Sequence, residues 1–308
     1  MSSASNDPLQ HFQPGSSPLQ RLGSRLLEQA GINLYIKRDD LIHPGFGGNK
    51  WRKLKYNLSN ARAKGHDTLL TFGGAWSNHI YATAAAGQFF GFRTIGFIRG
   101  EKPDRPGPTL QFAENKGMQL HFLDRETYRK KNRPDFLSAL ANEFRQPYIL
   151  PEGGSNRLAV KGCAEIIDEI EETQQPFDVI CCASGTGATL AGLASRLQPG
   201  QQAIGFSALK GGSFLLDEAR TYLPEDMPER NWSIETRFHF GGYARASNEL
   251  LDFIRNFRRQ HGILLDVVYT GKMFFGLWRM IEAGEFRPGT RIIVLHSGGQ
   301  QGNAGYDL

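Results

Sequence analysis

One lysine, Lys50, has the surroundings of a reactive amine. It follows the glycine-rich stretch HPGFGG, residues 43–48, and Asn49, whose side chain is expected to cap a helix running through WRKLKYNL. In the first turn of that helix the dipole disfavours an ammonium group, so Lys50 is expected to carry a neutral amine. A neutral amine can form a Schiff base with a carbonyl compound.

Two further lysines, Lys53 and Lys55, follow on the same predicted helix. A solvated basic helix explains both of them, and we interpret them as surface residues. That interpretation leaves the glycines before Lys50 unexplained, because an ordinary surface helix needs no close approach of its backbone. Lys50 is therefore the candidate nucleophile and base.

A second segment, CCASGTGATLAGLA, is typical of a phosphate cradle. A buried strand ends near residue 183 and a helix begins near residue 188, so glycine N–H groups and the positive helix terminus converge between them. The loop is neither G-x-G-x-x-G, because Leu190 takes the third glycine position, nor a P-loop. A plain tight turn is the alternative. The predicted loop residues are Ser184, Gly185, Thr186, Gly187 and Thr189.

Three other glycine-rich loops follow predicted strands: TFGGAWSNH, PEGGSN and LHSGG. The first brings Ser77, Asn78 and His79 to the start of a helix, where N–H groups could hold a carboxylate; an ordinary helix cap is the alternative. The second is most simply a hinge. The third presents Ser297, and VYTGK places Tyr269 and Thr270 just before a helix.

Several function classes lack their sequence signatures. We find no paired carboxylates, no G-x-S-x-G elbow and no metal-ligand spacing, so no metal site is expected. The formal net charge of +5 is scattered and lacks the basic–aromatic interleaving of a nucleic-acid binder. No apolar window of about 18 residues predicts a membrane span. With three cysteines, no paired motif and no signal pattern at the start, a cytoplasmic location is expected.

Short β-branched runs alternate with helical stretches along most of the chain, which favours βαβ units and parallel sheets. Strands are predicted at 34–40, 67–74, 93–100, 118–123, 148–151, 178–184, 203–209 and 291–299, whereas 211–240 reads as irregular or as a helix followed by a loop. We expect residues 51–154 to form a small α/β domain inserted into a larger one made of 1–50 and 155–308. A cleft between the two domains, near the carboxyl ends of the strands, would hold the ligand.

An imine-forming lysine combined with a phosphate cradle that lacks a nucleotide motif implies pyridoxal 5′-phosphate (PLP) as the cofactor. The motifs KRDDL, GGNKWRKL, GGAWSNH, PEGGSN, SGTGAT, VYTGK and LHSGG also occur in the order found in PLP enzymes of fold type II. From about Pro18 to Tyr306 the chain resembles the group that contains 1-aminocyclopropane-1-carboxylate (ACC) deaminase and D-cysteine desulfhydrase. The resemblance implies a tryptophan synthase β-like fold, with two three-layer α/β domains, mostly parallel sheets and a cleft between them.

The resemblance also implies roles for individual residues. Lys50 corresponds to the Schiff-base lysine that takes the Cα proton, and Asn78 to the residue that bonds the 3′-oxygen of the cofactor. Ser77, Asn78 and His79 correspond to residues around the substrate carboxylate, with Ser77 also catalytic. Tyr269 and Tyr243 correspond to two active-site tyrosines. The loop from Ser184 to Thr189 holds the phosphate, and Thr270 and Ser297 lie by the pyridine ring.

Two positions depart from ACC deaminase and resemble D-cysteine desulfhydrase. ACC deaminase has a glutamate where this chain has Thr270, and a leucine where this chain has Ser297. A carboxylate keeps the ring nitrogen protonated and the electron sink strong, whereas a hydroxyl donates to an unprotonated nitrogen. Because a thiolate, with a pKa of about 8.5 for its thiol, leaves more readily than carbon, Thr270 favours β-elimination.

The resulting prediction is β-elimination from a small amino acid, with D-cysteine converted to pyruvate, ammonia and H2S. ACC deaminase activity, giving 2-oxobutanoate and ammonia, is the alternative. A PLP-binding protein with little turnover is the third interpretation, because 211–240 matches the group poorly. The resemblance further implies a homodimer.

Overall fold

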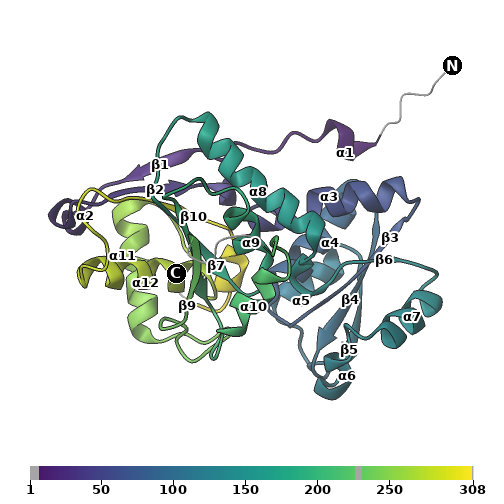
Figure 1. The fold of residues 1–308 in the computed structure, drawn as a ribbon. Coiled ribbons are helices and arrows are strands. Elements are labelled where there is room, and N and C mark those ends of the chain that lie inside the picture. The colour runs from purple at the N-terminus through teal and green to yellow at the C-terminus, as the bar shows by residue number, and fades with distance from the viewer. Residues whose placement is uncertain (1–6, 226–230, 307) are drawn as a thin grey trace.

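The computed structural model describes residues 7–225, 231–306 and 308, and its strands form two sheets (Figure 1). In the larger sheet β1 runs antiparallel to β2, and all the other neighbours in both sheets are parallel. The larger sheet has the order β1 (Leu19–Leu22), β2 (Asn33–Lys37), β10 (Arg291–Leu295), β7 (Val179–Ser184), β8 (Gln202–Ser207), β9 (Trp232–Glu235). The smaller has the order β5 (Met118–Leu123), β4 (Arg93–Arg99), β3 (Thr68–Gly73), β6 (Tyr148–Ile149).

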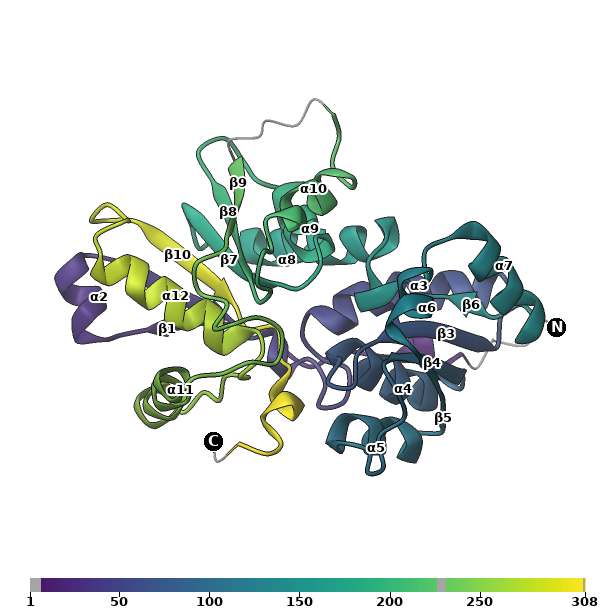
Figure 2. The same ribbon diagram turned by 90° about the horizontal axis from the view of Figure 1, so that it is seen from below.

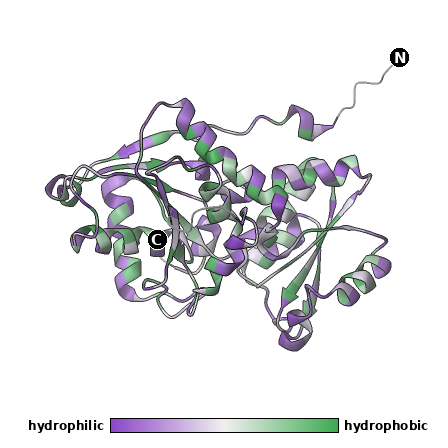
Figure 3. Cartoon of the chain, viewed as in Figure 1, coloured by the Kyte–Doolittle hydropathy of each residue, from purple (hydrophilic) through white to green (hydrophobic). Residues whose placement is uncertain are grey.

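Helices cover both sheets, and short 3-10 turns join several of them to strands. The helices are α1 (Pro8–His11), α2 (Arg25–Ala30), α3 (Asn49–Ala63), α4 (Asn78–Phe90), α5 (Pro108–Asn115), α6 (Arg125–Arg129), α7 (Pro134–Glu143), α8 (Arg157–Glu172), α9 (Ala188–Ala194), α10 (Phe214–Arg220), α11 (Asn248–His261) and α12 (Thr270–Glu282). The 3-10 turns are η1 (Asp39–Leu41), η2 (Glu152–Gly154) and η4 (Gln300–Asn303). Mixed hydrophilic and hydrophobic colour along the ribbons of the helices in Figure 3 reflects their amphipathic sequences.

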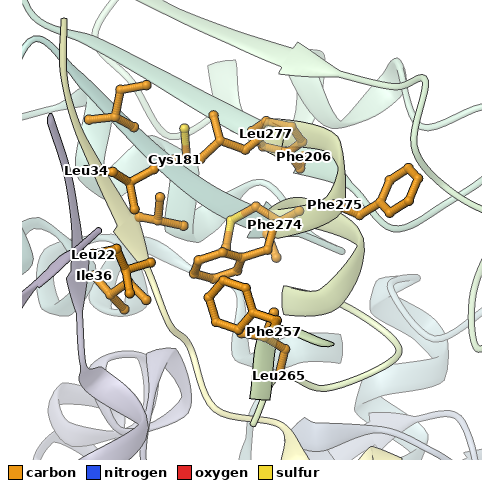
Figure 4. Close-up of a cluster of buried hydrophobic side chains, with 14 of the residues drawn as sticks. Leu22, Leu34, Ile36, Cys181, Phe206, Phe257, Leu265, Phe274, Phe275 and Leu277 are labelled. Atoms are coloured by element: carbon orange, nitrogen blue, oxygen red, sulfur yellow. The ribbon is translucent and has the colours of Figure 1, made fainter. Parts of the chain in front are cut away.

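The larger sheet is buried on both faces, which explains why its central strands are continuous apolar runs. On one face, side chains of α2, α11 and α12 pack on the sheet, with Phe257 and Phe274 beside Leu34 and Ile36 (Figure 4). On the other face, side chains of α8, α9 and α10 pack on β7, β8 and β10.

The smaller sheet is layered in the same way. Side chains of α3, α4 and α5 pack on one face, and those of α6 and α7 on the other. Mixed α/β layers around mostly parallel sheets confirm the predicted fold class.

The two sheets occupy separate lobes that α3 and α8 connect (Figures 1 and 2). These helices touch backbone to backbone at Gly162, where an added Cβ would lie 1.9 Å from the carbonyl oxygen of Arg52. The smaller sheet comes from residues 68–149 and the larger from both ends of the chain, but the predicted boundaries at 50 and 155 stay a prediction.

A buried ionic network fixes the start of α3 against the larger sheet. The Arg52 guanidinium donates to both carboxylate oxygens of Asp39, at 2.9 and 3.0 Å, and also to Glu169 of α8. Lys37, at the end of β2, donates to Glu169 at 2.7 Å. The motif KRDDL therefore joins β2, α3 and α8, because a buried charge is stable only when it is paired and hydrogen-bonded.

The predicted strands exist, with shifted ends. β2 ends at Lys37, not at residue 40, because Asp39 begins a 3-10 turn, and β10 ends at Leu295, before the loop that carries Ser297. The region 211–240 contains the helix α10, in agreement with the prediction of a helix followed by a loop. It also contains the strand β9 at the edge of the larger sheet, which was not predicted. Residues 226–230 of that region lie outside the described residues.

Candidate active site

A cavity of about 540 Å³ lies where loops of both sheets meet the first turn of α3. It is reached from the carboxyl ends of β3, β7 and β10, as expected of parallel α/β sheets. Ten of the predicted site residues line it: Lys50, Ser77, Asn78, His79, Gly185, Thr186, Thr189, Tyr243, Tyr269 and Ser297. Residues up to 247 positions apart in sequence (50 and 297) thus share one cavity.

Lys50 is the second residue of α3 and lines the cavity. Burial, and secondly the positive charge of Lys53, lower the pKa of Lys50 to about 7. A substantial part of the Lys50 amine is therefore neutral near pH 7, as a nucleophile and base requires.

The glycines before Lys50 allow a close approach, as predicted, although the cap differs. The helix is capped by Gly48 without a side-chain hydrogen bond, and the Asn49 amide instead donates to Thr189 at 3.1 Å. Gly48 has φ +68°, and a Cβ there would lie 1.9 Å from the carbonyl oxygen of Ser297. Only glycine lets the start of α3 touch the loop after β10, and this contact places Lys50 beside Ser297.

Lys53 is not a solvated surface residue, which corrects its prediction. Its side chain is 1% exposed, and its amine donates to Thr186 Oγ1 at 2.9 Å, Ser155 Oγ at 3.1 Å and the Gly153 carbonyl at 3.2 Å. The i, i+3 spacing brings it to the same face of α3 as Lys50. Lys55 points elsewhere and pairs with Glu165 of α8. Lys53 thus brings a cation to the predicted phosphate loop.

The loop after β7 divides its residues between the cavity and the core. Gly185, Thr186 and Thr189 line the cavity. Ser184 instead points to the core, with its hydroxyl 2.7 Å from the Cβ position of Gly205, and Gly187 packs against the backbone of α10. The predicted hydroxyl contribution of Ser184 is therefore not supported, and Lys53 supplements the cradle in its place.

The loop after β3 presents polar groups at the start of α4. The Ser77 hydroxyl accepts from the backbone N–H groups of His79 and Ile80, at 3.2 and 3.3 Å, so its own proton is free to donate into the cavity. The Asn78 side chain accepts a hydrogen bond from Gln301 and comes close to Gly299, where a Cβ would lie 2.5 Å from the amide nitrogen of Asn78. Both residues are placed to donate to a ligand.

His79 is a buried, neutral imidazole. Its Nε2 lies 2.8 Å from Thr71 Oγ1, and that hydroxyl donates to the Leu150 carbonyl at 3.0 Å. The tautomer with the proton on Nε2 satisfies both groups and leaves Nδ1 as a lone pair without a partner. Burial, with the charges of Lys50 and Lys53, holds the pKa of His79 well below its usual value. His79 therefore offers an acceptor, not a positive charge.

Tyr243 and Tyr269 form one side of the cavity, with ring centroids 6.2 Å apart. Burial raises the pKa of Tyr243 to about 12 and holds that of Tyr269 well above its usual value, so both stay protonated near neutral pH. The Tyr269 ring lies against Gly185, where an added Cβ would come within 2.8 Å of it. The two side chains are also hydrogen-bonded to each other, so one hydroxyl proton stays within the pair and one is left for a ligand.

Thr270 lies behind the cavity wall. It is fully buried, and its hydroxyl donates to Asp266 Oδ2 at 2.6 Å and accepts from the Asp266 N–H at 2.8 Å. This geometry does not support a Thr270 hydroxyl that is free to donate to a ring nitrogen. Ser297, which lines the cavity, is the remaining candidate for that contact.

The comparison that decides the family is a match to its sequence model. The model described as pyridoxal-phosphate dependent enzyme matches residues 12–298. The chain belongs to this family. As the sequence predicts, this PLP-dependent enzyme uses pyridoxal phosphate as its cofactor.

Relatives of the PLP-dependent enzyme extend over nearly its whole length. A putative ACC deaminase of Pyrococcus horikoshii is 32% identical over 95% of the chain and 92% of the relative. The D-cysteine desulfhydrase of Yersinia pestis is 31% identical over 92% of this chain and 91% of its own. The bifunctional D-cysteine desulfhydrase/ACC deaminase of Arabidopsis thaliana is 31% identical over 88% of this chain and 73% of its own.

Solved structures give the same fold. An ACC deaminase homologue has a TM-score of 0.78 and 31% identity, covering 96% of this chain and 94% of its own. A hydrogen sulfide-producing enzyme of Fusobacterium nucleatum shares the fold, with a TM-score of 0.69 and 16% identity. The match covers 96% of this chain and 99% of that enzyme.

The residues of the PLP-dependent enzyme fit its cofactor. Lys53, Thr186 and Thr189 line one side of the cavity with donors that suit a phosphate, and Lys50 supplies an amine with a lowered pKa in the same cavity. Within the described ranges, no group of three or more His, Cys, Asp or Glu residues could hold a metal ion. No helix among the described residues is long and apolar enough to cross a membrane.

Several cavity residues were missed in the sequence. Besides Lys53, they include Arg99, Lys131, Glu152 and Glu218. The i, i+3 spacing from Lys50 could have indicated Lys53, and Arg99 ends a predicted strand, where ligand contacts gather. Nothing local indicates Lys131 or Glu218.

Proposed function

We propose that the enzyme catalyses β-elimination from D-cysteine, giving pyruvate, ammonia and H2S. One observation carries this proposal: the loop after β10 presents to the cavity the hydroxyl of Ser297, at the position where ACC deaminase has a leucine. The nearby Asp266 is fully buried, and its carboxylate already accepts from Val268, Tyr269 and Thr270. A hydroxyl that donates to the ring nitrogen leaves that nitrogen unprotonated, without the strong electron sink that a carboxylate provides. Such a site suits a substrate with a good leaving group, such as sulfide.

The residues of the chain divide the remaining work. When bound, the cofactor withdraws electrons from the substrate Cα and makes its proton acidic. Lys50, with a pKa of about 7, takes that proton. Ser77 and Asn78 hold the substrate carboxylate at the start of α4, and the hydrogen-bonded pair of Tyr243 and Tyr269 donates its remaining hydroxyl proton to the leaving sulfur.

ACC deaminase activity is the second candidate. A relative with 32% identity has the name putative ACC deaminase, and the Arabidopsis relative is named for both activities. A PLP-binding protein with little turnover is the third. The homodimer, the amino-acid substrate and the cytoplasmic location remain proposals that rest on the resemblance.

One preparation of holoenzyme, incubated separately with D-cysteine, L-cysteine and ACC, tests the proposal. We expect pyruvate and sulfide in equal amounts from D-cysteine, faster than any 2-oxobutanoate from ACC. Faster 2-oxobutanoate release would favour the second candidate. Tightly bound cofactor with no keto acid from any of the three would favour the third.

A further inference from the structure

The mouth of the cavity carries positive charge that the cofactor site does not use. Arg99, the last residue of β4, and Lys131, between α6 and α7, both line it. The cradle, by contrast, is built from Lys53 and the loop after β7. The two mouth cations therefore need a separate explanation.

Lys131 already has a partner. Its amine lies 3.2 Å from Glu152 Oε2, and the other Glu152 oxygen accepts from the Tyr128 hydroxyl at 2.9 Å. This pair is neutral as a unit.

Arg99 has no such partner. In the described part of the chain, no carboxylate lies within 4.0 Å of its guanidinium, which instead lies 5.9 Å from the Tyr128 ring. Its charge acts within the cavity: burial raises the pKa of Tyr243 and of Tyr128, and the positive charge of Arg99 offsets part of that rise. Arg99 thus supplies one unpaired positive charge.

The position of Arg99 relates it to the substrate and not to the cofactor. Arg99 Nη2 and Tyr243 Cε1 both lie 3.8 Å from the Cβ position of Gly74, so the guanidinium and the phenol meet over this glycine. Gly74 begins the turn that leads to Ser77, the proposed carboxylate contact. A group on the substrate Cβ, held between Ser77 and Tyr243, would face Arg99.

We propose that Arg99 extends the ligands of the enzyme beyond D-cysteine: among small amino acids of the same shape, those with a negatively charged group on Cβ bind more tightly than neutral ones. This rests on the proposed β-elimination. For a phosphate ester such as O-phosphoserine, Lys50 takes the Cα proton, and the Cβ–O bond breaks with its electron pair going to phosphate. Water then hydrolyses the resulting enamine to pyruvate and ammonia. A guanidinium matches phosphate, sulfonate and carboxylate groups better than an ammonium does.

D-aspartate and D-asparagine are a matched pair of probes, because they have similar shapes, differ in charge and carry no β leaving group. Their dissociation constants from holoenzyme can be measured by the change in cofactor absorbance, and the L-enantiomers tested alongside. We expect D-aspartate to bind at least tenfold more tightly than D-asparagine. Arg99→Gln should abolish the preference and Arg99→Lys should keep part of it. Lys102→Gln, an exposed residue outside the cavity lining, should leave it unchanged.

Equal affinity for aspartate and asparagine in the natural protein would overturn the proposal. So would an equal loss for both ligands in Arg99→Gln, which would assign Arg99 to the α-carboxylate. Turnover separates this proposal from the one on which it rests. Retained charge selectivity without pyruvate from D-cysteine or O-phospho-D-serine would contradict the elimination chemistry alone.

Discussion

At the scale of single residues, the two buried lysines of α3 have different tasks. Burial lowers the pKa of both, but Lys53 makes three hydrogen bonds, one of them to Thr186 of the proposed phosphate loop, and we propose that Lys50 is the one that reacts. A charged donor to an anion contributes about 1.5–3 kcal/mol. The spacing of three residues lets one helix turn present both groups.

Lys53→Met should therefore weaken cofactor binding by roughly 10- to 100-fold, since 1.4 kcal/mol corresponds to a factor of ten. Titration of apoenzyme with pyridoxal phosphate, followed by absorbance, measures this. Lys55→Met is the matched control, because Lys55 pairs with Glu165 outside the cavity. Equal affinities of the two variants would mean that Lys53 does not hold the phosphate.

Lys50 could be predicted because its signal is local: glycines, then a helix start. The environment of Lys53 could not, because its partners Gly153 and Thr186 lie 100 and 133 residues away in sequence. The hydroxyl of Thr270 also looked free, although it donates a hydrogen bond to Asp266, only four residues earlier, because spacing alone does not show which way a side chain turns. The sequence indicates which side chains carry reactive groups. Only the contacts of the folded chain show which of those groups already have a hydrogen-bond partner.

At the scale of elements, α12 holds the loop that presents Tyr243. Lys272, 2% exposed, donates to the carbonyls of Gly242 at 2.7 Å, His239 at 3.0 Å and Ala208 at 3.5 Å. Burial lowers the pKa of Lys272 to about 8, so it is mainly charged at neutral pH. One side chain therefore joins α12 to the loop and to the end of β8.

Lys272→Met should lower kcat/KM for D-cysteine at least tenfold, because three buried carbonyls lose their donor and the Tyr243 loop loosens. Arg279→Met, on an exposed part of the same helix, is the control. Lys272→Arg, with a charge and several donors, should recover part of the activity. A similar small loss in Lys272→Met and Arg279→Met would show that the loop needs no such support.

The parallel strands were predictable because they are buried on both faces and so are continuous apolar runs. β9 was not, since WSIE is a four-residue edge strand that contains a serine and a glutamate. Its pairing with β8, from Ala203↔Trp232 to Phe206↔Glu235, forms only in the folded sheet.

At the scale of the whole molecule, the network of Lys37, Asp39, Arg52 and Glu169 joins the sheet to α3 and α8. Burial alone would raise the pKa of Glu169, but hydrogen bonds and charges of Arg52 and Lys37 outweigh it and lower the pKa to about 2. The network therefore adds stability above the usual pKa of 4.5, and this contribution is lost as pH falls toward 2.

Between about pH 4.5 and 2 the free energy of unfolding of the natural protein should fall more steeply than that of Glu169→Gln. At pH 7 the variant should be the less stable of the two. Urea unfolding across this range measures both effects. Asp168→Asn, whose carboxylate is 43% exposed beside Arg196, is the control. Parallel pH profiles of Glu169→Gln and the natural protein would contradict the role of the network.

The sheet order could not be predicted from periodicity. β10, from the far end of the chain, lies between β2 and β7, and this insertion brings Ser297 to Gly48 and Lys50. Alternating strands and helices predict parallel sheets, but which strands become neighbours depends on packing over the whole chain.

The most direct test of the site is to identify the lysine that carries the cofactor. Holoenzyme is reduced with borohydride, digested and mapped by mass spectrometry, with Lys50→Ala as a parallel sample. We expect the label on Lys50 alone, and no reducible linkage or cofactor absorbance band in the variant. A label on Lys53, or a linkage that survives in Lys50→Ala, would contradict it.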